Sequence, residues 1–275
     1  MSFDIEVLTI DDLAGCLALA QDREWRPEER RWRLLFELGT VFGVRDDDGR
    51  LAGTTVLTAF GTALSAISMV LVASEHGGRG LGRRLMEHAL AAARTDDVML
   101  YATAYGQPLY EKLGFTAGEP LHVHLGELSV PPTSRTRPAV PADLAAVTAL
   151  DRATTGAPRD RLVRWLFDSA ERLRVLERDG VIVGYGAAWN NLDQLMVAPV
   201  VAENDQDAKA LIGELTADAD RPVRVDLREA AAALREWVEH GGAARVLTST
   251  TMVLGGRTLP GDRSRWVVPA TQALG

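Results

Sequence analysis

Residues 77–82 read Gly77-Gly78-Arg79-Gly80-Leu81-Gly82, and this stretch decides what the chain folds into. It lies between an apolar strand that ends at Val72 and a predicted helix over 79–94 with apolar residues every four positions. Glycine lets backbone N–H groups approach an anion closely, and a helix N-terminus adds partial positive charge and unpaired donors. Because Arg79 and Arg83 add formal charge, the stretch predicts a phosphate site.

Two common phosphate loops do not fit these residues. A P-loop ends in Gly-Lys-Ser/Thr, whereas Gly82 is followed by Arg83-Arg84. The dinucleotide fingerprint G-x-G-x-x-G fails in register, because the sixth residue counted from Gly78 is Arg83. In addition, the next strand does not end in the acidic residue that would bind the ribose of a dinucleotide. The loop therefore indicates a phosphate site of another class.

The loop resembles that of the GNAT acyltransferase superfamily, Arg/Gln-x-x-Gly-x-Gly/Ala after a strand that often ends Val-x-Pro. Gly80 and Gly82 stand at its two small positions. Gly77 replaces the usual Arg or Gln, and Ser74 replaces the frequent Pro. Since the donors of this loop are backbone groups, we expect pyrophosphate binding to persist, with an affinity that Gly77 weakens.

A second motif supports the resemblance, which covers residues 3–128. Residues 107–115, Gln-Pro-Leu-Tyr-Glu-Lys-Leu-Gly-Phe, look like the closing helix of the family, Leu-Tyr-x-x-Leu-Gly-Phe. The resemblance implies acetyl-CoA as cosubstrate, and no metal cofactor is expected. The residues that it implies for coenzyme binding are Val70, Leu71, Val72, Gly77, Gly78, Arg79, Gly80, Leu81, Gly82 and Arg83.

The implied chemistry is the attack of an amine on the acetyl thioester, with departure of a thiolate. Tyr110 matches the tyrosine that protonates this thiolate in the family, and a phenol (pKa about 10) suits a thiol whose pKa is about 8.5. A backbone amide of residues 70–72 is implied to polarise the thioester carbonyl. The base is unassigned, and the candidates are Glu24, Glu28, His122 and His124. The two histidines share one strand face, but a third metal ligand is not visible.

The predicted elements around these motifs alternate between strands and helices. The expected order in the first half is a strand at 3–9, helices over 12–20 and 27–38, strands at 40–45, 51–60 and 63–72, the helix over 79–94, a strand at 98–103, a short helix at 107–113 and a strand at 121–128.

The second half repeats this order after a linker. Residues 130–138 contain two consecutive prolines with Ser and Thr, a composition typical of a linker. Residues 175–184 are similar to residues 44–53, and each stretch is expected to form a hairpin around an Asp-Gly turn. The helices expected at 159–170, 205–219 and 229–239 and the strand at 223–227 complete a second copy.

The sequence therefore predicts an α/β protein with a mixed sheet, made of two tandem GNAT-like domains. Each is expected to be a central, mostly antiparallel sheet flanked by helices. The predicted boundaries are 1–130 for the acetyl-CoA-binding domain, 131–137 for the linker and 138–275 for the second domain.

We expect the second copy to lack a coenzyme site. Residues 202–207 are acidic and contain no glycine, so this turn would repel a pyrophosphate. Trp237 stands where the first copy has Tyr110, and an indole cannot serve as the acid. A degenerate copy of this kind completes a substrate cleft, supports a homodimer or is purely structural.

The composition excludes several other classes of function. The 275 residues are 47% hydrophobic and carry a formal net charge of −8, so neither a basic nucleic-acid interface nor a membrane partner is expected. Cys16 is the only cysteine, which excludes an internal disulfide and fits a cytoplasmic location. No signal pattern or apolar membrane span is visible.

The function expected from these observations is an acetyl-CoA-dependent N-acetyltransferase that acts on a small-molecule amine. Two alternatives remain open from the sequence. One is a protein that senses acyl-CoA without catalysis, which fits Gly77 and the missing base. The other is an acetyltransferase for a protein N-terminus or lysine, which would need a broad open cleft.

Overall fold

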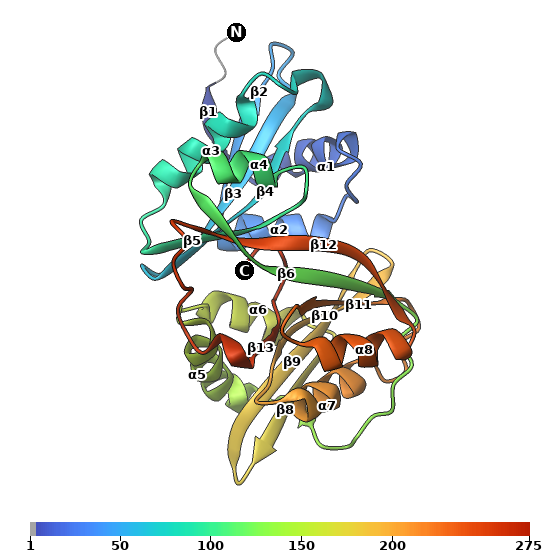
Figure 1. Ribbon diagram of the computed structural model, residues 1–275. Helices are drawn as coiled ribbons and strands as arrows, with labels where there is room; N and C mark the ends of the chain where they lie inside the picture. Colours follow the sequence, from blue (N-terminus) through green and yellow to red (C-terminus); the bar gives the residue numbers. More distant parts are fainter. Residues whose placement is uncertain (1–3) are drawn as a thin grey trace.

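The computed structural model describes residues 4–275 as an elongated molecule whose two halves lie end to end (Figure 1). The first half consists of β1 (Ile5–Leu8), α1 (Leu13–Asp22), α2 (Glu29–Leu38), β2 (Thr40–Arg45), β3 (Leu51–Phe60), β4 (Leu64–Val72), α3 (Leu81–Ala92), β5 (Asp97–Ala102), α4 (Gln107–Lys112) and β6 (Phe115–Gly126). These are the predicted elements with shifted ends: β6 begins at Phe115 rather than at Leu121. Residue 3, where the first strand is predicted to begin, lies outside the described residues.

The second half repeats this order, which confirms the predicted internal repetition. It consists of β7 (Arg137–Pro138), α5 (Leu144–Thr155), α6 (Asp160–Ser169), β8 (Arg172–Arg178), β9 (Val181–Asn191), β10 (Gln194–Val201), α7 (Asp205–Thr216), β11 (Val223–Arg228), α8 (Ala232–His240), β12 (Ala243–Leu254) and β13 (Trp266–Val268). Helix α8 begins later than predicted, because the Glu229 N–H donates to the Pro120 carbonyl of β6 and so continues the sheet.

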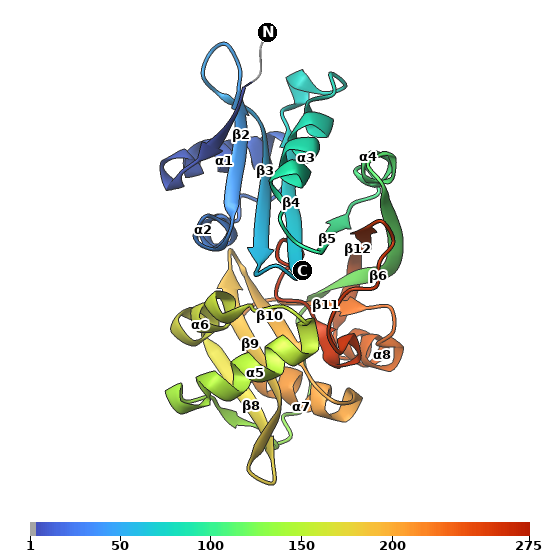
Figure 2. The same cartoon turned by 90° about the vertical axis from the view of Figure 1, so that its left-hand side faces the viewer.

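Each half is a mostly antiparallel sheet flanked by helices, as the sequence predicts (Figure 2). Only the pairs β4–β5 and β10–β11 are parallel among the described strands. The strands nevertheless form one continuous sheet, in the order β1-β2-β3-β4-β5-β12-β6-β11-β10-β9-β8-β7. Strand β12 of the second half pairs with β5, and β6 of the first half pairs with β11. The two halves therefore exchange strands β6 and β12.

The exchange brings two backbone segments into close contact at Gly126. This residue ends β6 and pairs with both Ala243 of β12 and Val223 of β11. A Cβ at Gly126 would lie 2.2 Å from the Gly242 carbonyl oxygen and 2.9 Å from the Ala243 Cα. Because both neighbours are backbone atoms, the crossing requires a glycine at this position.

Packing and polar contacts also hold the halves together. One hydrophobic cluster joins Leu35 of the first half to Leu166 and Leu274 of the second. The segment between α1 and α2 contacts the turn between β9 and β10, where the Asn191 amide donates to the Glu28 carboxylate. The second half therefore fixes the position of this segment.

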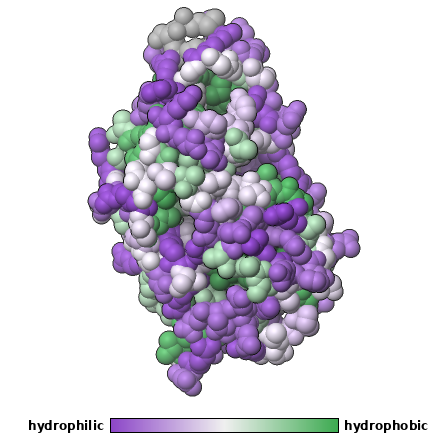
Figure 3. Space-filling view, in the orientation of Figure 1, coloured by the Kyte–Doolittle hydropathy of each residue, from purple (hydrophilic) through white to green (hydrophobic). Residues whose placement is uncertain are grey.

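The outer surface is mainly hydrophilic on the face drawn in Figure 3, with small, separate hydrophobic patches. Within residues 4–275, none of the helices combines the length and the apolar character that a bilayer crossing requires.

Candidate active site

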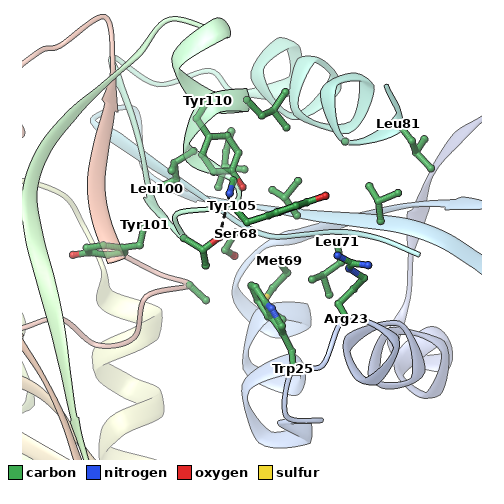
Figure 4. A pocket seen from close by; sticks show the side chains of 18 of the residues that line it. Arg23, Trp25, Ser68, Met69, Leu71, Leu81, Leu100, Tyr101, Tyr105 and Tyr110 are labelled. Carbon is green, nitrogen blue, oxygen red and sulfur yellow. Dashed lines mark hydrogen bonds between the residues drawn. The ribbon is translucent and has the colours of Figure 1, made fainter. Parts of the chain in front are cut away.

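The candidate site lies where β4 and β5 diverge. The two strands pair in parallel only over Leu64–Ala66 and Asp97–Met99. Beyond these residues they separate, and a cavity of about 610 Å³ lies between them. Figure 4 shows this cavity with Tyr110 on one side of it and Trp25 and Met69 on the other.

A bulge at Met69 shapes the wall that β4 forms. Met69 has a φ of 49°, a left-handed conformation that is uncommon outside glycine. The register with β3 shifts here, because Thr54 pairs with Leu71 whereas Val56 pairs with Ser68. The Thr54 hydroxyl stabilises the bulge by donating a hydrogen bond of 3.0 Å to the Met69 carbonyl. Over Ser68–Leu71, the edge of β4 opposite β3 pairs with no strand that the structure describes, so its backbone groups are available to a ligand.

The glycine loop follows β4 and leads into α3. Gly78 and Gly80 have φ values of 72° and 77°, which glycine adopts without strain, whereas Gly77 has an ordinary φ of −58°. The start of the loop is tied to α1, because the Asp22 carboxylate accepts hydrogen bonds from the Ser74 N–H at 2.6 Å and the Ser74 hydroxyl at 2.7 Å. These two bonds lower the pKa of Asp22.

The predicted coenzyme residues gather around this one cavity, with one exception. Val70, Leu71, Val72, Gly77, Gly78, Gly80, Leu81, Gly82 and Arg83 line it. Arg79 lies on the same loop, is exposed and is absent from the lining.

Tyr110, the predicted acid, lies on α4 above the centre of the cavity (Figure 4). Its ring packs edge-on against Phe115 at a centroid distance of 6.2 Å and lies so close to Gly106 that a Cβ there would be 2.9 Å from the Tyr110 Cε2 atom. Only 9% of the residue is exposed, and burial raises the pKa of the Tyr110 phenol to about 12. The phenol therefore stays protonated throughout the neutral range.

The remaining wall includes residues that the sequence does not single out. Arg23 and Trp25 come from the segment after α1, and Arg31 comes from α2. Arg224 of β11 and Gln272 come from the second half of the chain. No local pattern marks these positions, because the fold brings them together from separate parts of the sequence.

The lining is basic despite the acidic composition of the chain. Among the described residues it contains Arg23, Arg31, Arg83 and Arg224 but neither Asp nor Glu. None of the four base candidates lines the cavity: Glu24 is exposed, Glu28 pairs with Arg31, His122 contacts Glu229 and His124 lies 3.2 Å from Glu239.

In the second half, the chain itself fills the equivalent opening. Strands β10 and β11 pair only at Leu195–Val223 and Met196–Arg224, and β13 then pairs with β10 at Val200. The Asn204 side chain caps α7 by accepting a 3.0 Å hydrogen bond from the Asp207 N–H. In the second copy, β13 therefore covers the edge of β10 that corresponds to the free edge of β4. The Asn204 side chain likewise occupies the start of α7, which corresponds to the start of α3.

Trp237, which aligns with Tyr110, packs against the core of the second half. The Lys209 ammonium lies 5.7 Å from its ring centroid. An indole in this setting packs and attracts a cation, but it offers no titratable proton.

Comparisons with known proteins agree with this architecture. Residues 9–115 match the Acetyltransferase (GNAT) family, and residues 147–266 match a further Acetyltransferase (GNAT) domain. The uncharacterized N-acetyltransferase YitH of Bacillus subtilis is 29% identical over 227 residues, 79% of either chain. A candidate acetyltransferase from Pyrococcus horikoshii superposes over 99% of this chain and 96% of its own, with a TM-score of 0.84 at 18% identity. A tandem GNAT protein from the clavulanic acid biosynthesis pathway covers 94% of this chain and 100% of its own, with a TM-score of 0.66 at 14% identity.

Proposed function

This chain belongs to the GNAT acetyltransferase family and holds two copies of its domain, and from that premise we propose that the first copy transfers the acetyl group of acetyl-CoA to the amine of a small molecule. The observation that carries this proposal is the single cavity that joins the glycine loop, the free edge of β4 and Tyr110. Its far wall comes from the second half, which favours a small acceptor over a protein chain.

The coenzyme is expected to bind along β4. We expect the N–H groups at the start of α3 and in the glycine loop to bind the pyrophosphate, to which Arg83 adds positive charge. The unpaired backbone edge at Ser68–Leu71 matches the amide groups of the pantetheine arm, which hydrogen-bond as a neighbouring strand would. The acetyl group then lies near the bulge at Met69 and below Tyr110.

The residues present support direct transfer. The neutral amine attacks the carbonyl carbon of the thioester, and a backbone N–H of the β4 bulge stabilises the negative charge that develops on oxygen. As the C–S bond breaks, the Tyr110 phenol donates its proton toward the departing sulfur. The nitrogen releases its proton to water, since no carboxylate lies in the described lining, and the Tyr110 phenolate regains a proton from water. The products are an amide and free CoA.

Calorimetric titration with acetyl-CoA, followed by an amine panel in which free CoA is measured, tests this proposal. We expect saturable binding and release of CoA with a subset of the amines. Absence of binding at millimolar coenzyme would refute the proposal, and binding without CoA release would favour the sensing protein or the acetyltransferase for a protein amine.

Replacing Gly80 by Asp is expected to weaken acetyl-CoA binding at least 10-fold more than replacing it by Asn, because only Asp sets a negative charge against the pyrophosphate. Both side chains tolerate the left-handed backbone of this position, and a Cβ there meets no atom within 4 Å. Dissociation constants from calorimetry for the two variants check this prediction. Equal affinities would place the pyrophosphate elsewhere.

The pH dependence of the reaction should follow the acceptor rather than Tyr110. The pKa of Tyr110 is raised to about 12, so its acid form, and the contribution of that form to the rate, persists until the pH approaches that value. We expect kcat/KM to rise as the acceptor amine loses its proton and to show no falling limb up to at least about pH 10. A falling limb near about pH 9 that vanishes in Tyr110→Phe would contradict this.

A further inference from the structure

Arg31 carries unused hydrogen-bond donors at the wall of the cavity. It lies on α2 and lines the cavity, yet only 8% of the residue is exposed. Its Nη1 atom pairs with the Glu28 carboxylate. Its Nε and Nη2 atoms are buried and have no hydrogen-bond partner in the described part of the chain. A buried guanidinium with two unpaired donors is costly unless a ligand satisfies them.

The unpaired atoms form the edge of the guanidinium that binds carboxylates elsewhere in this chain. Arg224 donates from Nε and Nη2 to the two oxygens of Asp226, at 2.8 and 2.9 Å. Arg159 donates from the same atoms to the two oxygens of Asp151, at 3.0 and 2.6 Å. In Arg31 the equivalent edge is buried without a hydrogen-bond partner in the described part of the chain, and its donor geometry matches a planar carboxylate.

The surroundings of Arg31 also favour an anion. Arg224 lines the same cavity; burial and, after it, the positive charge of Arg224 lower the pKa of Arg31, whereas Glu28 acts in the opposite direction. The Ser68 hydroxyl, on β4 beside the bulge, is buried without a hydrogen-bond partner in the described chain and faces the same space. Gln272 donates to Asp226 at 2.9 Å and so helps to hold the Arg224–Asp226 pair in place.

From this arrangement we propose that the acceptor is an amino acid or a related amine that carries a carboxylate, and that Arg31 binds this carboxylate through Nε and Nη2. The inference rests on the proposed acetyl transfer. Arg31 lines the cavity but its Nε and Nη2 atoms are themselves buried, so the proposed binding requires a rotation of the Arg31 side chain that presents these atoms to the ligand. Arg224 and Ser68 complete the anion site, and the amine of the acceptor extends from it toward the β4 bulge and Tyr110.

Matched acceptor pairs test the assignment. Each pair consists of an amino acid and its decarboxylated amine, such as phenylalanine with phenethylamine and glycine with methylamine, and phosphoethanolamine represents phosphate-bearing amines. We expect kcat/KM of the acid to exceed that of its amine about 100-fold in the parent protein. The Arg31→Met variant should lower this preference to about fivefold or less, and Arg31→Lys should retain an intermediate part of it.

Arg33→Met is the matched control, because Arg33 lies on the same helix with an exposed side chain that pairs with Glu29. Calorimetry with acetyl-CoA and a thermal melt identify variants that fail to fold or to bind coenzyme. Amines turned over as fast as their acids, an unchanged preference in folded Arg31→Met, or a preference for phosphoethanolamine would each overturn the carboxylate site. Failure of the parent protein to bind acetyl-CoA would instead refute the proposed function itself.

Discussion

Replacing Tyr110 by Phe is expected to lower kcat about 100-fold while leaving acetyl-CoA affinity within about twofold of the parent value. The variant keeps the ring that packs against Phe115 and Gly106 and removes only the hydroxyl at the cavity wall. Without that hydroxyl, the departing thiolate has no positioned proton donor among the residues on α4. Steady-state rates of CoA release and calorimetric affinities measure the two quantities separately.

Tyr105→Phe is the control for this experiment. Tyr105 also lines the cavity, but 85% of it is exposed at the rim, so its hydroxyl is solvated and has no fixed direction. We expect less than about a threefold change in kcat for this variant. If Tyr110→Phe retained full turnover, Tyr110 would not be the general acid, and water would be the proton donor. If it lost coenzyme affinity instead, Tyr110 would have to be regarded as a binding residue.

The second large effect is expected at Gly126, where a Val side chain should lower the free energy of unfolding by about 3 kcal/mol or more. Its Cβ would lie 2.2 Å from the Gly242 carbonyl oxygen, so β6 or β12 must move apart. The exchanged strands lie between β5 and β11, and both halves of the sheet therefore lose pairing together. Thermal and denaturant unfolding of the full chain measure the loss.

Gly118→Ala is the matched control on the same strand. A Cβ there would lie 3.3 Å from the Thr251 carbonyl oxygen, a distance that a small shift relieves. We expect its cost to stay below about 1 kcal/mol. A Gly126→Val protein as stable as the parent would mean that strands β6 and β12 are not exchanged as described.

Local sequence signals are sufficient for the elements that contribute most of the predicted site. Gly78 and Gly80 adopt the left-handed backbone for which glycine is suited, and Tyr110 follows a helix start that Pro108 favours. These features depend on residues that are adjacent in the sequence, so a short sequence motif predicts them. The duplication can also be predicted from the sequence, because the second half repeats the order of helices and strands of the first half.

The strand exchange is not visible in the sequence. β6 and β12 lack a strict alternation of buried and exposed residues, and nothing in either one specifies whether its neighbour belongs to the same half. For the same reason Arg31 and Arg224 carry no signal, since their proximity depends on where β11 lies. β13 escapes prediction because three residues are too few to show a period.

The exchange also determines when the molecule can be completed during synthesis. β5, which already pairs with β4, gains its second neighbour only after residues 243–254 have emerged from the ribosome, and β6 must wait for β11. Until then both strands present unpaired backbone groups, which are templates for pairing with another chain. Such distant pairing also slows folding. A chain that stops before residue 243 should therefore be an aggregation-prone fragment rather than a smaller acetyltransferase.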